Sequence, residues 1–358
     1  MKTYKHLYPQ IYTFANLERA YRRARKGKRD KDQVMWFEFN VEDELIRLQE
    51  ELASQTYRPG PYRHFYITEP KVRKISAAPF RDRVVHHALC QIIEPIFERR
   101  FIFDSYACRI GKGTHRALDR AQEFAREHRY ALKCDIRQCF PSIDHAILRD
   151  LLARPLADPD VLWLIDQILN SGASALTDVY EMQWYPGDDL FAAARPRGLP
   201  IGNLTSQFWA NVYLNELDQF VKRELKCRAY VRYVDDFLLF ADDKATLHEW
   251  KSAVREFLAR LRLTMHERKS VVFPAAMGFA FLGFRVYLPY RRLRRENVRA
   301  FVRRFRRLQY RYATGALELA DLDRSAQAWI AHAAHGNTDK LRARLFRQMP
   351  FAPGVALG

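Results

Sequence analysis

Two adjacent carboxylates lie between two apolar, β-prone segments of the chain. Tyr233-Val234-Asp235-Asp236 separates Ala229 to Tyr233 from Phe237 to Ala241, which predicts a β-hairpin with both acids at its turn. Two ionised carboxylates side by side repel each other unless a cation lies between them. Asp135 has a matching context, because it follows the apolar segment Tyr130 to Cys134 at another predicted strand end. Three carboxylates on neighbouring strands predict a two-metal site for phosphoryl transfer.

Two further acidic pairs occur in different contexts. Asp188-Asp189 follows Pro186-Gly187 in a segment without flanking strands, and Asp242-Asp243 follows the second arm of the predicted hairpin. Aspartate is common in turns because its side chain bonds nearby backbone groups. We therefore expect these two pairs to be solvated turn residues and only the hairpin pair to do chemistry.

The composition indicates a folded protein with a polyanionic partner. The chain has 358 residues, of which 48% are hydrophobic, enough for a sizeable core in two or three domains. Its formal charge of +18 and pI near 9.8 favour nucleic acid as the partner, with an anionic membrane surface as the alternative. No apolar run approaches the length of a membrane span, and the N-terminus lacks the apolar stretch of a signal peptide. Five cysteines without a Cys-x-x-Cys pair predict reduced thiols in a cytoplasmic protein. Of the two polyanions we expect nucleic acid, and no membrane, as the partner.

Apolar periodicity and charge divide the chain into five ranges. The first is predicted as a helix, a basic loop and a second helix over Val41 to Gln55. For its basic cluster from Arg19 to Lys31, nucleic-acid contact and a solvated face are both open. The connection between Gly172 and Pro200 is long and rich in Pro and Gly, which is typical of a surface insertion. The predicted ranges are 1–60, a basic helical extension; 61–129, strands and then helices; 130–285, the strands with the acids and the insertion at about 172–200; 286–350, helices; and 351–358, a tail.

Arginine dominates one stretch of the C-terminal part. Between Arg285 and Arg311 there are eleven arginines and a single acid, Glu296. Phe301, Phe305 and Leu308 recur at helical spacing within this stretch. The pattern predicts a helix with one apolar face on the body and one cationic face for phosphates. We place Arg303 and Arg307 among the residues that contact nucleic acid.

The order of these motifs resembles the reverse transcriptases from about residue 60 to residue 350. The Tyr233 to Asp236 motif matches in its strand context, and Lys133 to Asp144 matches the pattern of a catalytic Asp with an aromatic residue five positions later, here Phe140. Phe281-Leu282-Gly283-Phe284 is similar to the primer-grip turn of that family. The resemblance implies an α+β right-hand polymerase with fingers over 61–129, an antiparallel palm sheet backed by helices over 130–285, and a helical thumb over 286–350.

The resemblance also implies roles for individual residues. Asp135, Asp235 and Asp236 would be catalytic and, with the carbonyl of Ile136, would bind two Mg²⁺ ions, for which Mn²⁺ could substitute. Phe140 would be a steric gate against the ribose 2′ hydroxyl, with a plain core phenylalanine as the alternative. The remaining assignments to the nucleotide site are Lys71, Arg73, Arg109, Ile201, Gln207 and Lys269, and those to nucleic acid are Lys112, Tyr233 and Gly283.

One motif favours a particular branch of the family. Pro200-Ile201-Gly202-Asn203-Leu204-Thr205-Ser206-Gln207 has Ile where group II intron enzymes typically have Gln, and Gln where they have Pro. This form resembles the reverse transcriptases of diversity-generating retroelements, which are bacterial or phage-encoded and copy a template RNA into cDNA with errors at adenines. The implied partners are template RNA, primer or cDNA, dNTPs, a small basic accessory protein and a structured element RNA. Since isoleucine offers no hydrogen bond for discrimination, we predict reduced fidelity.

Other functions are compatible with the same residues. The same chemistry could serve a retron, an antiphage defence system or a stripped group II intron, meaning one whose protein has no endonuclease or DNA-binding extension. A function of a different class is an RNA-binding scaffold without catalysis, which the presence of all three carboxylates disfavours. The template, the priming mechanism, the accessory partner and the oligomeric state are left open by these motifs.

Overall fold

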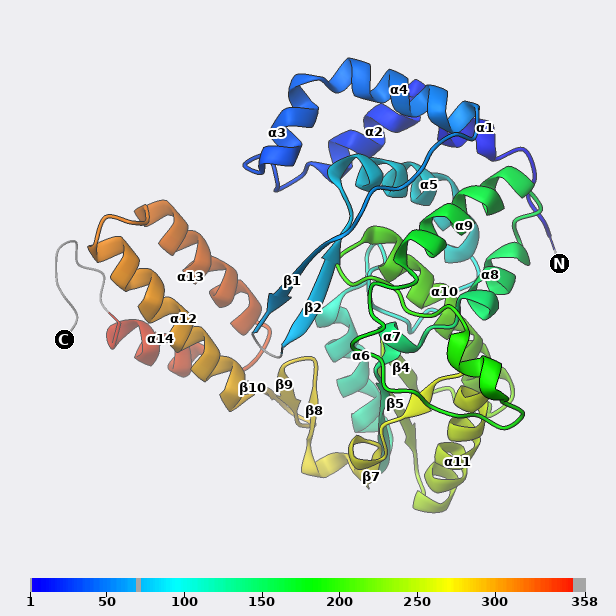
Figure 1. Cartoon of the computed structure of the whole chain (residues 1–358). Coiled ribbons are helices and arrows are strands. Elements are labelled where there is room, and N and C mark those ends of the chain that lie inside the picture. The colour runs from blue at the N-terminus through cyan, green and yellow to red at the C-terminus, as the bar shows by residue number, and fades with distance from the viewer. Residues whose placement is uncertain (1, 69–71, 350–358) are drawn as a thin grey trace.

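The chain forms a layer of N-terminal helices, a central body built around a sheet, and a C-terminal helical lobe that stands to one side (Figure 1). The computed structural model describes residues 2–68 and 72–349. Lys71 and the predicted tail over 351–358 lie outside the described residues. No helix of the described ranges is long and apolar enough to cross a bilayer. All five cysteines lie in these ranges, and none of them is paired in a disulfide.

The N-terminal layer consists of four helices packed against a fifth. They are α1 (Tyr8–Ile11), α2 (Phe14–Ala24), α3 (Asp32–Phe39) and α4 (Val41–Ala53), and they cover α5 (Phe80–Glu98). Leu17, Ala20 and Tyr21 of α2 are buried together with Leu48 of α4, as helical spacing requires. The helical character predicted for residues 1–60 is therefore present, but the sequence pattern missed α3.

A two-stranded hairpin projects from this layer toward the C-terminal lobe (Figure 1). Strands β1 (Arg63–Ile67) and β2 (Arg73–Ala77) pair antiparallel, from Arg63 opposite Ala77 to Ile67 opposite Arg73. Helix α6 (Thr114–Glu127) follows α5 after a loop and covers the sheet. Residues 63–127 thus contain two strands followed by two helices.

The central sheet is antiparallel, and β3 (Tyr130–Arg137) lies in its middle. On one side β3 pairs with β5 (Asp236–Ala241), which pairs with β4 (Tyr230–Tyr233); on the other side it pairs with β6 (Thr264–Met265) and β7 (Val271–Pro274). The surrounding helices are α7 (Cys139–Ser142), α8 (His145–Ala153), α9 (Pro159–Gly172), α10 (Leu204–Arg223) and α11 (Lys244–Arg260), with short 3₁₀ turns η1 (Leu190–Ala194), η2 (Glu267–Lys269) and η3 (Ala275–Met277).

Both faces of the central sheet are buried. Leu132 and Cys134 of β3 join the hydrophobic cluster shared with the N-terminal helices, whereas Ala131 joins the cluster shared with α6 and the C-terminal lobe. On β5, Leu239 joins the first of these clusters and Phe240 joins the second, because successive side chains of a strand point to opposite faces. This burial explains why β5 is an almost continuous apolar run rather than an alternating one. The α+β class with an antiparallel sheet backed by helices is thus as predicted.

The segment between residues 172 and 200 is irregular, but it is anchored to the sheet body. Arg195 donates to the buried carboxylate of Asp144 at 2.6 and 2.9 Å. Arg262 donates to both carboxylate oxygens of Asp188 at 2.5 and 2.9 Å, and the Asp188 side chain is only 7% exposed. The expectation that Asp188 is a solvated turn residue is therefore wrong. Asp242, at 66% exposure, is the turn residue that was expected.

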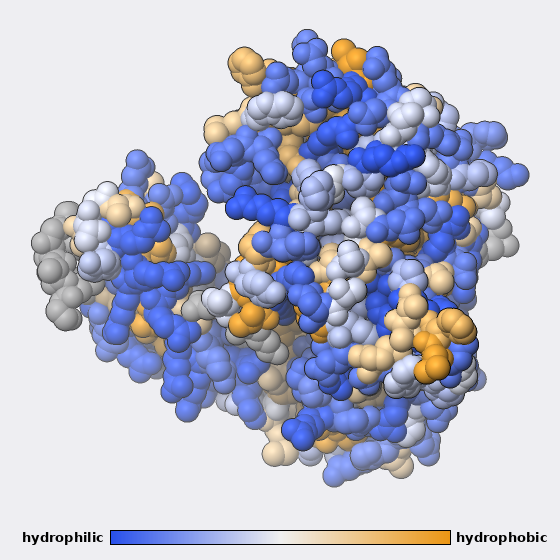
Figure 2. All heavy atoms as spheres, in the orientation of Figure 1, coloured by the Kyte–Doolittle hydropathy of each residue, from blue (hydrophilic) through white to orange (hydrophobic). Residues whose placement is uncertain are grey.

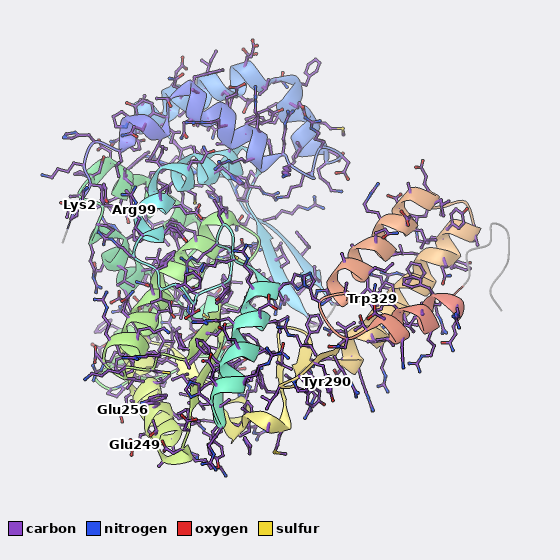
Figure 3. All side chains as sticks on the ribbon, turned by 180° about the vertical axis from the view of Figure 1, so that it is seen from behind. Lys2, Arg99, Glu249, Glu256, Tyr290 and Trp329 are labelled. Carbon is purple, nitrogen blue, oxygen red and sulfur yellow. The ribbon has the colours of Figure 1, made fainter. Side chains whose placement is uncertain are left out.

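The C-terminal lobe is a three-helix unit joined to the body through a small sheet. Strands β8 (Phe279–Phe281), β9 (Phe284–Val286) and β10 (Arg291–Leu293) lead into α12 (Arg295–Ala313), α13 (Leu319–Ala333) and α14 (Asp339–Arg347). Phe301 of α12 stacks on Trp329 of α13 with 4.0 Å between ring centroids. Figure 3 shows Trp329 within the lobe from behind, and Tyr290 at its junction with the body. The arginine-rich helix therefore has an apolar face, but this face packs on α13 and α14 inside the lobe, so the prediction that it packs on the body is wrong.

Candidate active site

The predicted hairpin forms, and its turn carries the adjacent acids. Tyr233 of β4 pairs with Asp236 of β5, so Val234 and Asp235 are the two turn residues. Val234 has φ +54°, a left-handed conformation that a β-branched residue rarely adopts. Backbone strain of this kind costs about 1–3 kcal/mol and persists where the surrounding structure enforces it. The turn is therefore held by its neighbours rather than by local preference.

Asp135 lies directly beside this turn. It is opposite Asp236 in the β3–β5 register, so the two side chains project from the same face of the sheet. The N–H of Ile136 donates to the carbonyl of Asp235 at 3.1 Å, which ties the turn to β3. The structure thus brings the three predicted carboxylates together from two neighbouring strands and the turn.

The electrostatics of this cluster indicate a deficit of positive charge. Burial raises the pKa of the Asp235 carboxyl, and the charge of Asp135 acts in the same direction. Burial also raises the pKa of Asp236 to about 6, although the charge of Lys133 opposes the shift. The Oδ1 atom of Asp236 is buried without a hydrogen-bond partner. A further cation at this place would relieve both the repulsion and the unpartnered oxygen.

Two lysines contact the carboxylates. Lys133 Nζ lies 3.3 Å from Asp236 Oδ2 and also donates to the carbonyl of Ala280 on β8 at 2.8 Å. Lys269 Nζ lies 2.9 Å from Asp135 Oδ1. In this arrangement no three His, Cys, Asp or Glu side chains of the described residues form a group that could hold a metal ion. The donor types nevertheless fit Mg²⁺, because it prefers carboxylate and carbonyl oxygens and retains water ligands.

Phe140 lies in the short helix that follows β3. It belongs to α7, and its side chain is partly buried against the main hydrophobic cluster. Its carbonyl accepts a hydrogen bond from the N–H of Leu199 at 2.9 Å, and the carbonyl of Ile143 accepts one from Gly198 at 2.8 Å. The end of the insertion therefore fixes the backbone that carries Phe140.

The Ile201 motif connects α10 to the projecting hairpin. The carbonyl of Ile201 accepts from the N–H of Ser76 on β2 at 2.9 Å. The buried Asn203 side chain accepts from the N–H of Ala78 and donates to the carbonyl of Ser76. Gly202 has φ +116°, and a Cβ there would lie 2.9 Å from Ile75, so glycine is required. Ile201 is partly buried, whereas Gln207 on α10 is exposed.

The predicted cations differ in their placement. Arg73, exposed at the start of β2, is close enough to Asp235 for its charge to lower the pKa of that carboxyl. Arg109 is directed elsewhere: its guanidinium donates to Glu98 at 2.7 to 3.0 Å and to the carbonyls of Ile102 and Ser105. The structure does not bring Arg109 to the carboxylates, because these structural partners occupy its donors.

The residues assigned to nucleic acid lie in three places. Lys112 donates to the carbonyl of Phe103 at 2.7 Å, and Tyr233 Oη accepts from Thr114 at 3.2 Å. Gly283, with φ +87°, accepts at its carbonyl from Asn297 of α12 at 3.1 Å, so the predicted primer-grip turn contacts the start of the C-terminal lobe. Arg303 and Arg307 are exposed on α12. Arg291, by contrast, is buried in an ion pair with Asp119 at 2.7 Å.

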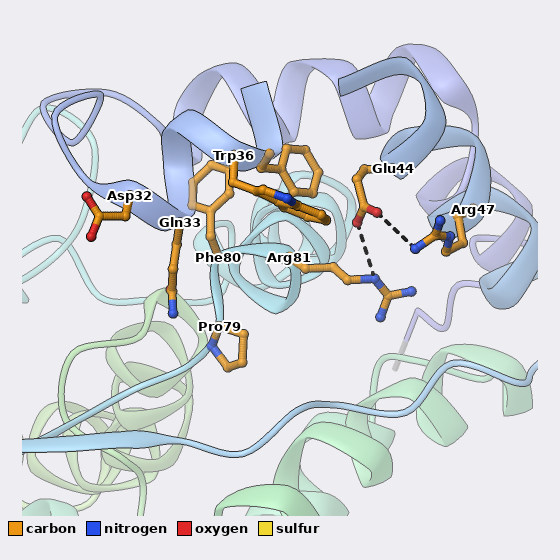
Figure 4. A pocket seen from close by; sticks show the side chains of 9 residues that line it. Asp32, Gln33, Trp36, Glu44, Arg47, Pro79, Phe80 and Arg81 are labelled. Carbon is orange, nitrogen blue, oxygen red and sulfur yellow. Dashed lines mark hydrogen bonds and ion pairs between the residues drawn. The ribbon is translucent and has the colours of Figure 1, made fainter. Parts of the chain in front are cut away.

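A separate cavity lies in the N-terminal layer. It has a volume of about 490 Å³ and is lined by Trp36, Phe80 and Arg81 among others (Figure 4). Its buried acid, Glu44, is paired with Arg47 at 3.0 Å and with Arg81 at 3.9 Å. Because Glu44 is paired with arginines and the walls are mostly apolar, we do not assign phosphoryl transfer to this cavity. The reactive groups of the molecule gather at the hairpin turn instead.

The part of the chain that carries the three carboxylates is similar in sequence to known proteins. The family described as reverse transcriptase (RNA-dependent DNA polymerase) matches residues 67–286, which include all three carboxylates. Protein YkfC of Escherichia coli K12 is 27% identical over 283 residues, covering 68% of this chain and 71% of YkfC. The group II intron-encoded protein LtrA of Lactococcus lactis is 24% identical over 344 residues, covering 78% of this chain. The chain spans only 54% of the length of LtrA.

The fold has also been compared with solved structures. Apo telomerase from Candida tropicalis superposes with a TM-score of 0.44 and 11% identity over 64% of this chain and 48% of the telomerase chain. Telomerase from Candida albicans in complex with a fragment of telomeric RNA gives a TM-score of 0.43 and 10% identity over 79% of this chain and 58% of that chain.

Proposed function

The chain belongs to the reverse transcriptase family, and on this premise we propose that it copies a template RNA into cDNA by metal-dependent nucleotidyl transfer. The enzyme class of the family, RNA-directed DNA polymerase, is the one that the sequence predicted. The observation that carries the mechanism is the placement of Asp135 opposite Asp236 beside the strained turn with Asp235. Primer extension on a defined RNA template is the direct test.

The carboxylates would hold the metal ions of this reaction. Asp135, Asp235 and Asp236, together with the carbonyl of Ile136, would hold two Mg²⁺ ions, for which Mn²⁺ could substitute. When bound, the ions would lower the pKa of the primer 3′ hydroxyl and neutralise charge on the phosphates. The protein itself contributes positioning, because the β3–β5 register fixes the separation of the carboxylates.

Several neighbouring side chains would hold the incoming nucleotide. Lys269 and Arg73 both act electrostatically on the carboxylates, so each is within range of a triphosphate bound there. Lys133 is held on Asp236 and the β8 carbonyl, which leaves it as a support for the carboxylate rather than a nucleotide contact. Phe140 would lie against the sugar as a gate for dNTPs.

The arginines of α12 would bind the phosphates of the template and primer. The C-terminal lobe has a largely hydrophilic surface in the view of Figure 2. The exposed arginines of α12 include Arg299, Arg303, Arg304, Arg306 and Arg307. Each phosphate contact releases counterions, which makes affinity depend on salt.

Charge reversal at Arg303 and Arg307 tests this surface. We expect Arg303→Glu/Arg307→Glu to weaken RNA binding and to reduce the slope of log affinity against log salt by about 1.5. Fluorescence anisotropy with a labelled RNA, measured across a salt series, gives the slope. The matched control is Arg324→Glu/Arg342→Glu, since these arginines pair with Asp321 and Asp339 within their own helices. An equal loss of slope in both variants would contradict a contact at α12.

We propose further that the enzyme is error-prone and serves a diversity-generating retroelement. Support comes from the Ile201-Gly-x-x-x-Ser-Gln motif, which has an apolar side chain where a glutamine would hydrogen-bond. Ile201 borders β2, whose first residue, Arg73, is close to Asp235. The partners in this case would be a small basic accessory protein and a structured element RNA, in addition to the template RNA, primer and dNTPs.

Substitution of Ile201 tests the proposed infidelity. We expect Ile201→Gln to lower the frequency of misincorporation by about tenfold, most strongly opposite template adenines, because it restores a polar contact. Sequencing of individual cDNA molecules measures the error spectrum. Ile46→Gln, an exposed change of the same kind on α4, is the control. An unchanged error spectrum in Ile201→Gln would rule out Ile201 as the cause.

A second function is favoured by the curated relatives. LtrA is a group II intron-encoded protein by its name, and it aligns over most of this chain. Accurate cDNA from the wild-type chain would therefore favour an intron-type enzyme, with a retron or antiphage defence role as further possibilities. A scaffold without catalysis would leave the clustering of three carboxylates without a purpose.

A further inference from the structure

The guanidinium of Arg232 lies beneath the carboxylate-bearing turn. Arg232 is on β4, immediately before Tyr233, and its side chain is 0% exposed. All five of its N–H groups have acceptors. Nε and Nη2 donate to Asp218 at 2.7 and 2.6 Å, Nη2 also donates to Ser105 at 3.0 Å, and Nη1 donates at 3.3 Å to both Asn211 and the carbonyl of Val234.

The acceptors come from separate parts of the body. Asp218 and Asn211 belong to α10, and Asp218 also accepts from the hydroxyl of Tyr230 at 2.8 Å. Ser105 lies in the loop after α5, and Asn211 anchors the same loop by donating to the carbonyl of Ala107 at 2.8 Å. Because the polar groups are mutually satisfied, this buried network can be rigid.

One arm of the network reaches the strained turn. The carbonyl of Val234, the residue with φ +54°, accepts from Arg232, and the carbonyl of Asp235 accepts from Ile136 on β3. We propose that Arg232 is a positioning residue that transmits the rigidity of α10 to this turn and so fixes Asp235 and Asp236 for nucleotidyl transfer. The inference rests on the proposed function for its effect on catalysis, but not for its effect on the turn.

A purely stabilising role predicts something different. A buried ion pair can often be replaced by apolar residues of similar volume without loss of stability. If Arg232 served only the core, Arg232→Met/Asp218→Leu would preserve activity along with the fold. If Arg232 positions the turn, the same replacement preserves the fold but loses the bond to the Val234 carbonyl. Lysine cannot substitute, since its single ammonium cannot reproduce the planar fork.

The decisive experiment uses the full chain with Arg232→Lys and with Arg232→Met/Asp218→Leu, the latter made in a Tyr230→Phe background because the buried Tyr230 hydroxyl would otherwise lose its acceptor. We expect the double variant to keep its melting temperature and its KM for dNTP, while kcat for primer extension falls about a hundredfold. Hydrogen exchange at the Ile136 amide should accelerate, whereas exchange at Leu132, in the middle of β3, should not change. Arg149→Met/Asp166→Leu, which replaces an ion pair between α8 and α9, is the matched control.

The outcomes separate the two proposals. A double variant with native melting temperature, wild-type kcat and unchanged exchange at Ile136 would overturn the positioning role. If the double variant fails to fold, Arg232→Lys decides through the same exchange and kcat measurements. If the wild-type chain makes no cDNA, the proposed function fails, and exchange at Ile136 still shows whether Arg232 holds the turn.

Discussion

Asp235→Asn is expected to lower the rate of primer extension by at least about a thousandfold, because metal coordination supplies several kcal/mol of transition-state stabilisation. Asparagine keeps the shape of the side chain but removes the negative charge that would help to hold the metal ions. The fold should survive, since burial raises the pKa of Asp235 and its ionised form is therefore unfavourable in the folded state at neutral pH. We expect an equal or higher melting temperature at pH 7 in the presence of a chelator.

Single-turnover extension of a labelled DNA primer on RNA measures this loss. The matched control is Asp242→Asn, because Asp242 is exposed and follows the same strand, β5. The control should extend primers at the wild-type rate. Wild-type extension by a folded Asp235→Asn variant would show that this carboxylate does not bind the reacting metal ions.

Phe140→Val is expected to raise the use of ribonucleotides relative to deoxyribonucleotides by about ten- to a hundredfold, the range that one shape contact in a pocket can provide. The reason is steric: a phenyl ring under the sugar would leave no room for the 2′ hydroxyl, whereas the smaller valine side chain would leave room for it. The hydrogen bond from Leu199 to the Phe140 carbonyl should keep the backbone in place in the variant. The ratio of kcat/KM for dGTP to that for GTP measures the change.

An exposed phenylalanine provides the control for this substitution. Phe191 is 81% exposed on η1, so Phe191→Val should leave the sugar selectivity unchanged. Unchanged selectivity in a folded Phe140→Val variant would mean that Phe140 is a core residue only.

Local patterns were sufficient to predict the central part of the fold. The hairpin over 229–241 and the strand before Asp135 are recognisable because the sheet is buried on both faces and its strands are apolar runs ending in acids. Helix α3 was missed because its apolar residues do not form one stripe: Val34 and Phe37 are buried, whereas Met35, Trp36 and Phe39 are exposed.

Long-range partners explain the remaining differences. Asp188 is buried by Arg262, which is 74 residues away, and no pattern near Asp188 indicates that partner. Arg109 is likewise held by Glu98 and by backbone carbonyls of its own loop. An arginine or lysine can pair with a carboxylate of the protein or bind a ligand. The residue type does not distinguish these two roles, so the fold is needed to assign them.

The sequence allowed us to predict the acids of the candidate site, but not the side chains that hold those acids in place. Lys133 stands two residues before Asp135, so strand periodicity places it on the same face, and this signal could have been used. Arg232 stands alone as a charge in an apolar strand, which indicates a buried partner without identifying it. Its partner, Asp218, comes from α10 and required the structure.

The most direct test of the account is extension of a DNA primer by the full wild-type chain on a defined RNA template with dNTPs and Mg²⁺. The account predicts a DNA product that is complementary to the RNA, disappears when a chelator is added, and is absent with Asp235→Asn. A wild-type chain that is folded and binds the primed template, yet makes no DNA with either Mg²⁺ or Mn²⁺, would contradict it and would favour an RNA-binding scaffold.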